Sequence, residues 1–196
     1  MNQKARTRGA LVHAAEELLR QGVTPTVAQA AEAAQVGRTT AYRYFPTQES
    51  LLVELSVTMD VSDVEALVAE PVERDGVRER VVEVVQRLNR HVHDEEVQYR
   101  TTLRLYQDQW LEAVAQGETS PTVREGRRTR WLAQSLAPLD LPKRERDRLV
   151  AALSLVMGAE AMVALRDVCH LSTEQALAVT DWATRALLDA ALGAER

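Results

Sequence analysis

Residues 26–52 read TVAQAAEAAQVGRTTAYRYFPTQESLL, and this stretch predicts two short helices joined by a tight turn. Thr26 is suited to cap the first helix, because Gln29 follows three residues later, at the capping-box spacing. Small apolar residues then recur at helical spacing. Gly37 can adopt the backbone angles of a tight corner, and a second helix over residues 38–45 ends before a proline. The stretch therefore predicts a helix-turn-helix.

The second of these helices carries side chains that suit contact with DNA. A helix-turn-helix places its second helix in the major groove. Arg38 and Arg43 can reach phosphates or guanine edges, and the neighbouring threonine hydroxyls can hydrogen-bond to either. Tyr42 and Tyr44 carry hydroxyl groups on rigid rings. The periodicity alone equally allows an ordinary helical hairpin whose tyrosines belong to the core.

The residues of this segment resemble the DNA-binding domain of the tetracycline-repressor (TetR) family of bacterial transcription regulators. The resemblance runs from about Arg8 to Leu55 and rests on Thr26, Ala31, Ala34 to Val36, Thr40 to Pro46 and Glu49 to Leu52. It implies a homodimer that reads double-stranded operator DNA and responds to a small-molecule inducer. The chain is thus expected to be a transcription regulator, most readily a repressor, and not an enzyme.

The resemblance also suggests which side chains contact DNA. We expect groove contacts from Arg38, Thr39, Thr40 and Tyr44, and contacts to the phosphate backbone from Thr26, Tyr42, Arg43 and Gln48.

The sequence departs from the family pattern at several positions. The family usually has Gly at Gln35, Ser at Gly37, and larger aliphatic residues at Ala30 and Ala41. It very often has Lys at Gln48, where an ammonium meets a phosphate. Gln48 leaves at most a neutral hydrogen bond there, so the salt dependence of DNA binding should be shallower. This loss is the one feature that favours the alternative, a helical small-molecule-binding or enzymatic module with a vestigial helix-turn-helix.

Composition and charge fit a helical protein with a basic N-terminal end. The chain is 45% hydrophobic and 27% charged, which is typical of globular rather than disordered proteins. Residues 1–45 hold six Lys or Arg and three Glu, which gives a net charge of +3. Because the whole chain carries −5, residues 46–196 carry −8. This asymmetry orients the basic end toward a polyanion. Cys169 is the only cysteine, which excludes an intrachain disulfide and fits the cytoplasm.

Hydrophobic periodicity predicts an all-α fold of about nine helices. The resemblance implies that an N-terminal three-helix helix-turn-helix DNA-binding domain (residues 1–50) precedes a helical ligand-binding and dimerisation domain (residues 51–196). The expected helices cover residues 3–21, 26–34, 38–45, 47–70, 76–93, 95–115, 121–136, 142–168 and 172–192. Met59 is expected to face inward on the fourth of them.

The last two expected helices are apolar nearly all round. In the resembling family they pair across a two-fold axis, and the small residues Gly158, Ala159, Ala161 and Ala164 independently suggest such a homodimer interface. The apolar run 149–165 falls short of a membrane span and contains Glu160. The N-terminus does not have the pattern of a signal peptide. We therefore expect no membrane contact.

A stripe of large side chains on the helix over residues 95–115 is the candidate ligand surface. It consists of Tyr99, Leu103, Tyr106 and Trp110, and we expect Trp131, Met157 and Glu160 to complete a pocket with it. The alternative is that these aromatic side chains fill the core, which is the more common role. Glu160, a carboxylate in an apolar helix, requires a partner such as Arg100 or Arg104, or else contacts a ligand.

Other constellations do not indicate enzymatic or metal chemistry. His91 and His93 would point to different faces of one helix, so they do not predict a metal site. Cys169 next to His170 does not place a base at a nucleophile. The chain has no phosphate-binding glycine loop and no nucleophile elbow. We expect no cofactor and no metal.

Overall fold

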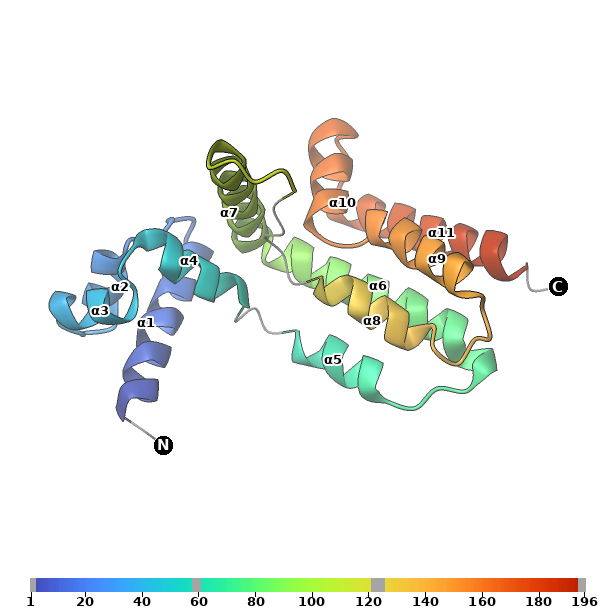
Figure 1. The fold of residues 1–196 in the computed structure, drawn as a ribbon, viewed down its shortest axis with the longest axis horizontal. Coiled ribbons are helices and arrows are strands. Elements are labelled where there is room, and N and C mark those ends of the chain that lie inside the picture. Colours follow the sequence, from blue (N-terminus) through green and yellow to red (C-terminus); the bar gives the residue numbers. More distant parts are fainter. Residues whose placement is uncertain (1–2, 58–60, 121–125, 194–196) are drawn as a thin grey trace. The chain divides into compact units, whose positions relative to one another are not determined.

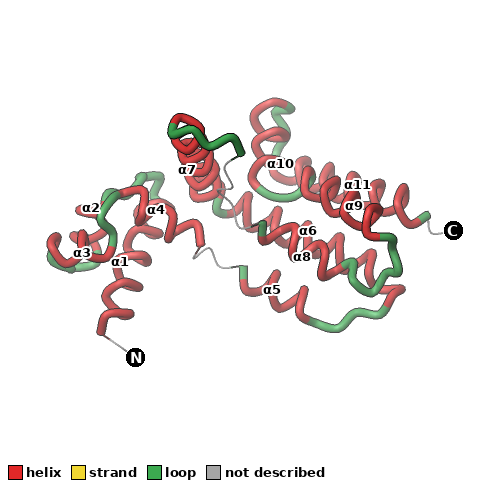
Figure 2. The backbone as a smooth tube through the Cα atoms, in the orientation of Figure 1, coloured by secondary structure: helices red, strands yellow, loops and turns green. Residues whose placement is uncertain are grey.

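The structure is a computed structural model that describes residues 3–57, 61–120 and 126–193, and these residues form helices and connecting loops without a strand (Figures 1 and 2). The all-α prediction is confirmed. The elements are α1 (Gln3–Arg20), α2 (Val27–Ala33), α3 (Arg38–Tyr44), α4 (Gln48–Val57), α5 (Ser62–Ala69), η1 (Arg74–Gly76), α6 (Val77–Asp94), α7 (Glu96–Ala115), α8 (Arg127–Ser135), α9 (Lys143–Leu155), α10 (Ala159–Val163), the π-helical η2 (Ala164–Val168) and α11 (Thr173–Leu192).

The chain divides into two compact units. Unit 1 comprises Met1–Met59 and Glu95–Arg124, and unit 2 comprises Asp60–Asp94 and Glu125–Arg196. Helix α7 therefore packs with the N-terminal helices, although it follows α5 and α6 in the sequence. The predicted division into residues 1–50 and 51–196 concerns function as well as packing, and it stays a prediction.

Unit 1 is built around the inward face of α1. Leu11 and Ala15 of α1 are buried with Leu51 and Leu55 of α4, and Leu105 of α7 completes the cluster. Helix α1 ends at a glycine, Gly22, whose φ of 79° is the left-handed conformation usual after a helix. This shared core fixes α1, α4 and α7 as the support on which α2 and α3 rest.

Unit 2 is built around α6, which contacts α5, α8, α10 and α11. Its valines and leucine recur at helical spacing and are buried, as the periodicity of residues 76–93 predicts: Val81, Val84, Val85, Leu88 and Val92. The last helix begins with a capping box between Ser172 and Gln175, which confirms the predicted start.

The single helix expected over residues 47–70 is wrong. Helix α4 ends at Val57 and α5 begins at Ser62, with a non-helical backbone at Val61 (φ −121°, ψ 24°). Acidic Asp63 and Glu65 lie in the first turn of α5, where they favour a new helix start. The inward position expected of Met59 lies outside the described residues. The helix expected over residues 121–136 begins later than predicted, at Arg127, because Gly126 has a left-handed backbone (φ 70°).

The single helix expected over residues 142–168 is also wrong, because it is broken between α9 and α10. Gly158 has a φ of 97°, which no helix contains. The side chain of Asn89 on α6 accepts from the Gly158 N–H (2.8 Å) and donates to the Val156 carbonyl (3.0 Å). Arg128 on α8 donates to the Met157 carbonyl (2.7 Å). Side chains from two other helices thus hold the backbone at the break.

Within the described ranges, no helix taken singly has both the length and the apolar character needed to cross a membrane. Helix α9 and the α10–η2 segment meet these criteria together, as a pair bent by 45°.

Candidate nucleic-acid interface

Helix α2 begins with the capping box that the sequence predicts. The Thr26 hydroxyl accepts from the Gln29 N–H (3.2 Å), and the Gln29 side-chain oxygen accepts from the Thr26 N–H (2.9 Å). The Thr26 hydroxyl also lies 2.9 Å from the same Gln29 oxygen. Both donors of Thr26 therefore face Gln29. The phosphate contact predicted for Thr26 stays a prediction, and it requires one of these donors to be released or shared.

The turn between α2 and α3 is a Schellman motif with glutamine at its left-handed position. Gln35 has a φ of 54°, and its N–H donates to the Glu32 carbonyl (3.1 Å). The next N–H, of Val36, donates to the Ala31 carbonyl (2.8 Å), and the Val36 side chain packs against the core of unit 1. These are the two bonds that define the motif.

Gly37 does not form the corner that the sequence predicts for it. Its backbone is extended (φ −59°, ψ 135°), and it serves as the N-cap of α3 without a side-chain hydrogen bond. The prediction assigned the left-handed angles to the only glycine in the turn. Gln35 has them instead, because the hydrogen bonds of the turn fix the position and not the residue type.

Helix α3 has one buried and one exposed face. Ala41 and the following Phe45 are buried in the core of unit 1. The side chains expected to face DNA divide into four exposed ones (Arg38, Thr39, Tyr42 and Arg43) and two half-buried ones (Thr40 and Tyr44). The exposed fraction of Tyr42 is 46%, so the alternative in which both tyrosines are core does not hold for Tyr42.

Tyr44 lies at the edge between the two faces. Its ring packs partly against the core cluster of unit 1, and the guanidinium of Arg43 lies 5.7 Å from the centre of that ring. This contact holds the Arg43 side chain against α3. Arg38 and Arg43 form no ion pair with any residue that the structure describes, so both positive charges remain available for phosphates.

Arg8 of α1 supports α3, the second helix of the helix-turn-helix (the recognition helix), a role that the sequence did not indicate. It donates to the Glu54 carboxylate of α4 (2.7 Å), and its guanidinium lies 5.7 Å from the centre of the Phe45 ring, just after α3. Arg8 thus links α1, α4 and the end of α3. Its spacing from Glu54 along the chain gives no sequence signal for the pair.

Helix α4 begins beside the end of α3 with a second reciprocal cap. The Thr47 hydroxyl accepts from the Ser50 N–H (3.2 Å), and the Ser50 hydroxyl accepts from the Thr47 N–H (3.3 Å). The pKa of Glu49 is lowered by a backbone hydrogen bond and by the Thr47 hydroxyl. Gln48 is the first residue of α4 and is half-buried. The predicted phosphate contact of Gln48 stays a prediction.

The seven residues predicted to bind a ligand fall into two groups. Tyr99, Leu103, Tyr106 and Trp110 belong to α7 in unit 1, and Trp131, Met157 and Glu160 belong to unit 2. On α7 the first three are half-buried and Trp110 is exposed. Trp131 and Met157 are buried. A pocket formed by both groups stays a prediction.

Glu160 has a structural partner, although not the one suggested by the sequence. Arg128 donates to both oxygens of its carboxylate (2.7 and 3.1 Å). Arg100, one of the two arginines considered, pairs with Glu96 on its own helix (2.7 Å). The carboxylate is therefore neutralised within unit 2, in the geometry typical of a paired guanidinium.

His91 is part of a structural contact rather than of a metal site. Its Nε2 lies 2.7 Å from an Asp63 carboxylate oxygen, which links α6 to α5. In the described parts of the chain, no group of three or more His, Cys, Asp or Glu side chains is placed to hold a metal ion.

Comparison with known proteins gives a matching family and several similar solved structures. The family model described as "Bacterial regulatory proteins, tetR family" matches residues 11–55, which include α2, α3 and most of α1 and α4. No match was found among curated proteins. A TetR transcriptional regulator from Rhodococcus sp. RHA1 has a similar fold, with a TM-score of 0.63 at 18% sequence identity. The similarity covers 95% of this chain and 97% of that chain.

Proposed function

Because this chain belongs to the TetR family of bacterial regulatory proteins, we propose that it is a repressor released from its operator by a small-molecule inducer. The family makes it a DNA-binding transcription regulator. The direction of regulation and the release by an inducer are our proposal. It acts in the cytoplasm, where bacterial operators are found.

The exposed face of α3 is the observation that carries DNA binding. Two pairs of exposed residues, each separated by one turn, lie on this short helix: Arg38 with Tyr42, and Thr39 with Arg43. The opposite face of the helix is buried. In a helix-turn-helix such a face enters the major groove. Arg38, at the first position of α3, is the side chain proposed to read a guanine edge, and Tyr42 and Arg43 contact the backbone.

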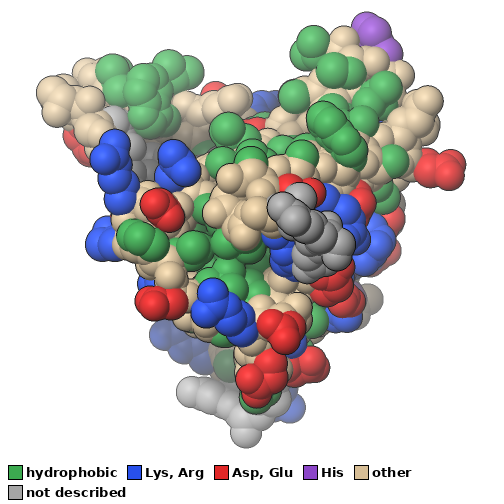
Figure 3. Space-filling model, turned by 90° about the vertical axis from the view of Figure 1, so that its right-hand side faces the viewer, with side chains coloured by type: hydrophobic (Ala, Val, Ile, Leu, Met, Phe, Trp, Pro, Cys, Tyr) green, Lys and Arg blue, Asp and Glu red, His purple; other side chains and the backbone are tan. Residues whose placement is uncertain are grey.

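A homodimer formed by α9, η2 and α11 would present two such faces to one operator. These elements expose large apolar side chains: Leu155, Val168, Val179 and Trp182. Figure 3, which faces the C-terminal side, shows hydrophobic side chains exposed among charged ones. Exposed apolar surface of this kind is typical of an interface between subunits. A two-fold dimer then matches two half-sites about 34–36 Å apart.

The inducer is proposed to bind through the α7 stripe (Tyr99, Leu103, Tyr106 and Trp110) together with Trp131, Met157 and Glu160. Half-buried tyrosines and an exposed tryptophan combine apolar area with polar groups, as ligand sites do. Binding would favour a spacing of the two α3 helices that does not match the operator. A thermal-shift screen of small molecules, followed by operator release, tests this part.

DNA binding is tested by titrating the protein with the DNA upstream of its own gene at several salt concentrations. We expect specific binding that weakens steeply as salt rises. Arg38→Gln should weaken binding to the specific site by roughly 5- to 150-fold, which corresponds to about 1–3 kcal/mol. Arg144→Gln, which removes another exposed arginine, serves as the control. Absence of binding at low salt would favour the vestigial alternative.

Tyr42→Ala separates the DNA-facing and core roles of the second helix. Because Tyr42 is nearly half exposed, its loss should weaken operator binding without dissociating the dimer. Loss of the dimer in this variant would contradict the placement of Tyr42 on the DNA-facing side.

A further inference from the structure

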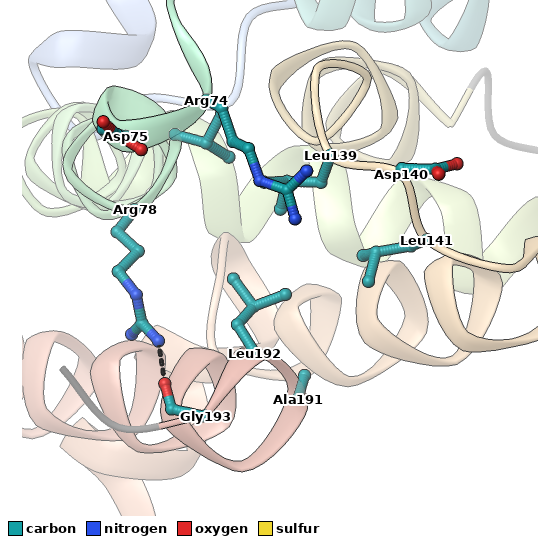
Figure 4. Close-up of a pocket in the computed structure, with 10 residues that line it drawn as sticks. Arg74, Asp75, Arg78, Leu139, Asp140, Leu141, Ala191, Leu192 and Gly193 are labelled. Atoms are coloured by element: carbon teal, nitrogen blue, oxygen red, sulfur yellow. Dashed lines mark hydrogen bonds between the residues drawn. The ribbon is translucent and has the colours of Figure 1, made fainter.

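A cavity of about 380 Å³ lies in unit 2 (Figure 4), and its lining includes none of the residues assigned above to the DNA interface or to the inducer surface. It is bounded by η1 and the first turn of α6, by the loop between α8 and α9, and by the last turn of α11. Its volume falls near the lower end of the range for small-molecule sites, about 300–1,000 Å³. Three segments distant in the sequence thus form one concave site.

The wall of this cavity has two arginines with different surroundings. Arg78 is already neutralised, because it pairs with Asp189 (2.6 Å) and also donates to the Gly193 carbonyl. The Arg74 side chain has no hydrogen bond or ion pair with any residue in the described part of the chain. Figure 4 shows its guanidinium directed toward the middle of the cavity, between Leu139 and Leu192. Arg74 is therefore the positive charge available to a ligand.

Two carboxylates also line the cavity, at its margins. Figure 4 shows Asp75 and Asp140 on opposite sides of the view, with Arg74 between them. A cationic ligand in the middle would be repelled by the unpaired guanidinium of Arg74. A ligand with several negative charges would be repelled by the carboxylates of Asp75 and Asp140. A single negative charge placed at Arg74 avoids both conflicts.

The remaining lining is apolar. Val77 and Leu139 are buried beneath the cavity, and Leu141, Ala191 and Leu192 are half-buried around it. A ligand that places a hydrocarbon group on these side chains removes apolar surface from water.

We propose that this cavity binds a small amphipathic monocarboxylate. The carboxylate accepts hydrogen bonds from the Arg74 guanidinium, a geometry for which arginine is well suited, and the apolar part lies against Leu139, Leu141 and Leu192. The site shares no residue with the proposed inducer surface or with the DNA interface. A bound ligand would link the start of α6 to the end of α11 and so stabilise unit 2.

The test uses sodium octanoate as the probe, with the full chain and without DNA. Calorimetric titration should show binding of octanoate and much weaker binding of 1-octanol and octylammonium, which lack the negative charge. Arg74→Gln should raise the Kd of octanoate about fivefold, as expected for a solvent-accessible ion pair worth about 1 kcal/mol. Arg144→Gln, outside the cavity, should leave the Kd unchanged.

A second variant tests the cavity without removing a charge. Ala191→Leu fills part of the space from a half-buried position, so it should also raise the Kd of octanoate. Backbone NMR shifts on titration should fall on residues of η1, the α8–α9 loop and the end of α11. An Arg74→Gln variant that binds octanoate like the wild type, or equal binding of 1-octanol, would overturn the proposal. Shifts confined to Tyr99–Trp110 would overturn it while supporting the proposed inducer surface.

Discussion

Gln35 holds the left-handed backbone of the turn in front of the recognition helix. This conformation costs a residue with a side chain about 1–2 kcal/mol, whereas glycine adopts it freely. Glycine in turn loses about 0.5–1 kcal/mol of additional chain entropy on folding. The hydrogen bonds of the turn, from the Gln35 and Val36 N–H groups, hold the conformation in place despite this cost.

We expect Gln35→Gly to raise the free energy of unfolding by about 0.5–1 kcal/mol. Urea unfolding followed by circular dichroism measures the change. Ala10→Gly, at an exposed position of α1, introduces the same residue into a helical backbone and should lower the free energy by about 1 kcal/mol. Destabilisation by both variants would show that the turn does not strain Gln35.

Glu49 reports on the cap that starts α4. Its pKa is lowered by a backbone hydrogen bond and by the hydroxyl of Thr47. A carboxyl whose folded pKa is lowered adds stability above its unfolded pKa, and this contribution disappears as the pH falls through its folded pKa. Protonation of Glu49 in acid should therefore weaken the start of α4.

Thr47→Ala should move the pKa of Glu49 upward, toward the ordinary value, because one of its hydrogen-bond donors is lost. An NMR titration of the Glu49 side-chain carboxyl gives this value directly. Thr24→Ala removes a hydroxyl from an exposed loop position and should leave the titration of Glu49 as it is in the wild type. If the pKa of Glu49 is unchanged in the Thr47→Ala variant, the Thr47 hydroxyl does not contribute to lowering it.

At the scale of helices, the break between α9 and α10 depends on residues from elsewhere in the chain. Asn89 of α6 and Arg128 of α8 bond to three successive residues at the break, and Gly158 supplies the backbone angle. A Cβ atom on Gly158 would lie 2.7 Å from the Arg128 guanidinium, which is closer than real Cβ contacts. The direction of α10 is therefore set jointly by α6 and α8.

Gly158→Ala should lower the free energy of unfolding by about 2 kcal/mol, since both the backbone angle and the space oppose a side chain. Gly9→Ala in α1 meets no atom within 4 Å and should instead be stabilising. Thermal and urea unfolding measure both. In an Arg128→Ala background part of the Gly158→Ala loss should disappear, because the clash is removed while the backbone strain remains. Equal losses in the two backgrounds would contradict the contact with Arg128.

These elements show what sequence can and cannot predict. The valine spacing along α6 gives the limits of that helix to within a residue, because the signal is local. The cap at Thr26 gives the start of α2 for the same reason, and the start of α11 lies within the predicted pair Ser172 and Thr173. The break after α9 was missed because the Asn89 side chain, which accepts a hydrogen bond from the Gly158 N–H, lies 69 residues away in the sequence. A local sequence pattern carries no information about a partner that is so distant in the sequence.

The same distinction applies to the DNA interface. The outward positions of Arg38 and Tyr42 follow from helical spacing and a single buried alanine on α3. The left-handed Gln35 was missed because the turn was assigned to its only glycine. Arg8 was missed because its partner Glu54 lies on another helix, 46 residues away. Backbone hydrogen bonds within the turn decide the first case, and tertiary packing decides the second.

At the scale of the whole molecule, charge and apolar surface divide between the two ends of the sequence. Residues 1–45 carry a net charge of +3 and include the exposed arginines of α3, whereas residues 46–196 carry −8. A basic head on an acidic chain is oriented toward DNA by the long-range field. The exposed apolar side chains of α9, η2 and α11 are the surface proposed to join two such chains.

Trp182→Glu tests whether this surface joins the chains. Trp182 is 70% exposed, so glutamate, a good helix former, should leave the helical circular dichroism unchanged. In a dimer, however, each copy would bury an unpaired carboxylate, which should weaken dimerisation by about 100-fold or more. Sedimentation velocity measures the dimer, and operator affinity should fall with it because the two recognition helices no longer bind as one unit. Leu111→Glu on α7 adds the same charge at a side chain that is 61% exposed and should leave the dimer intact. If Trp182→Glu dimerises like the wild type, a different surface must bring the two recognition helices to the operator.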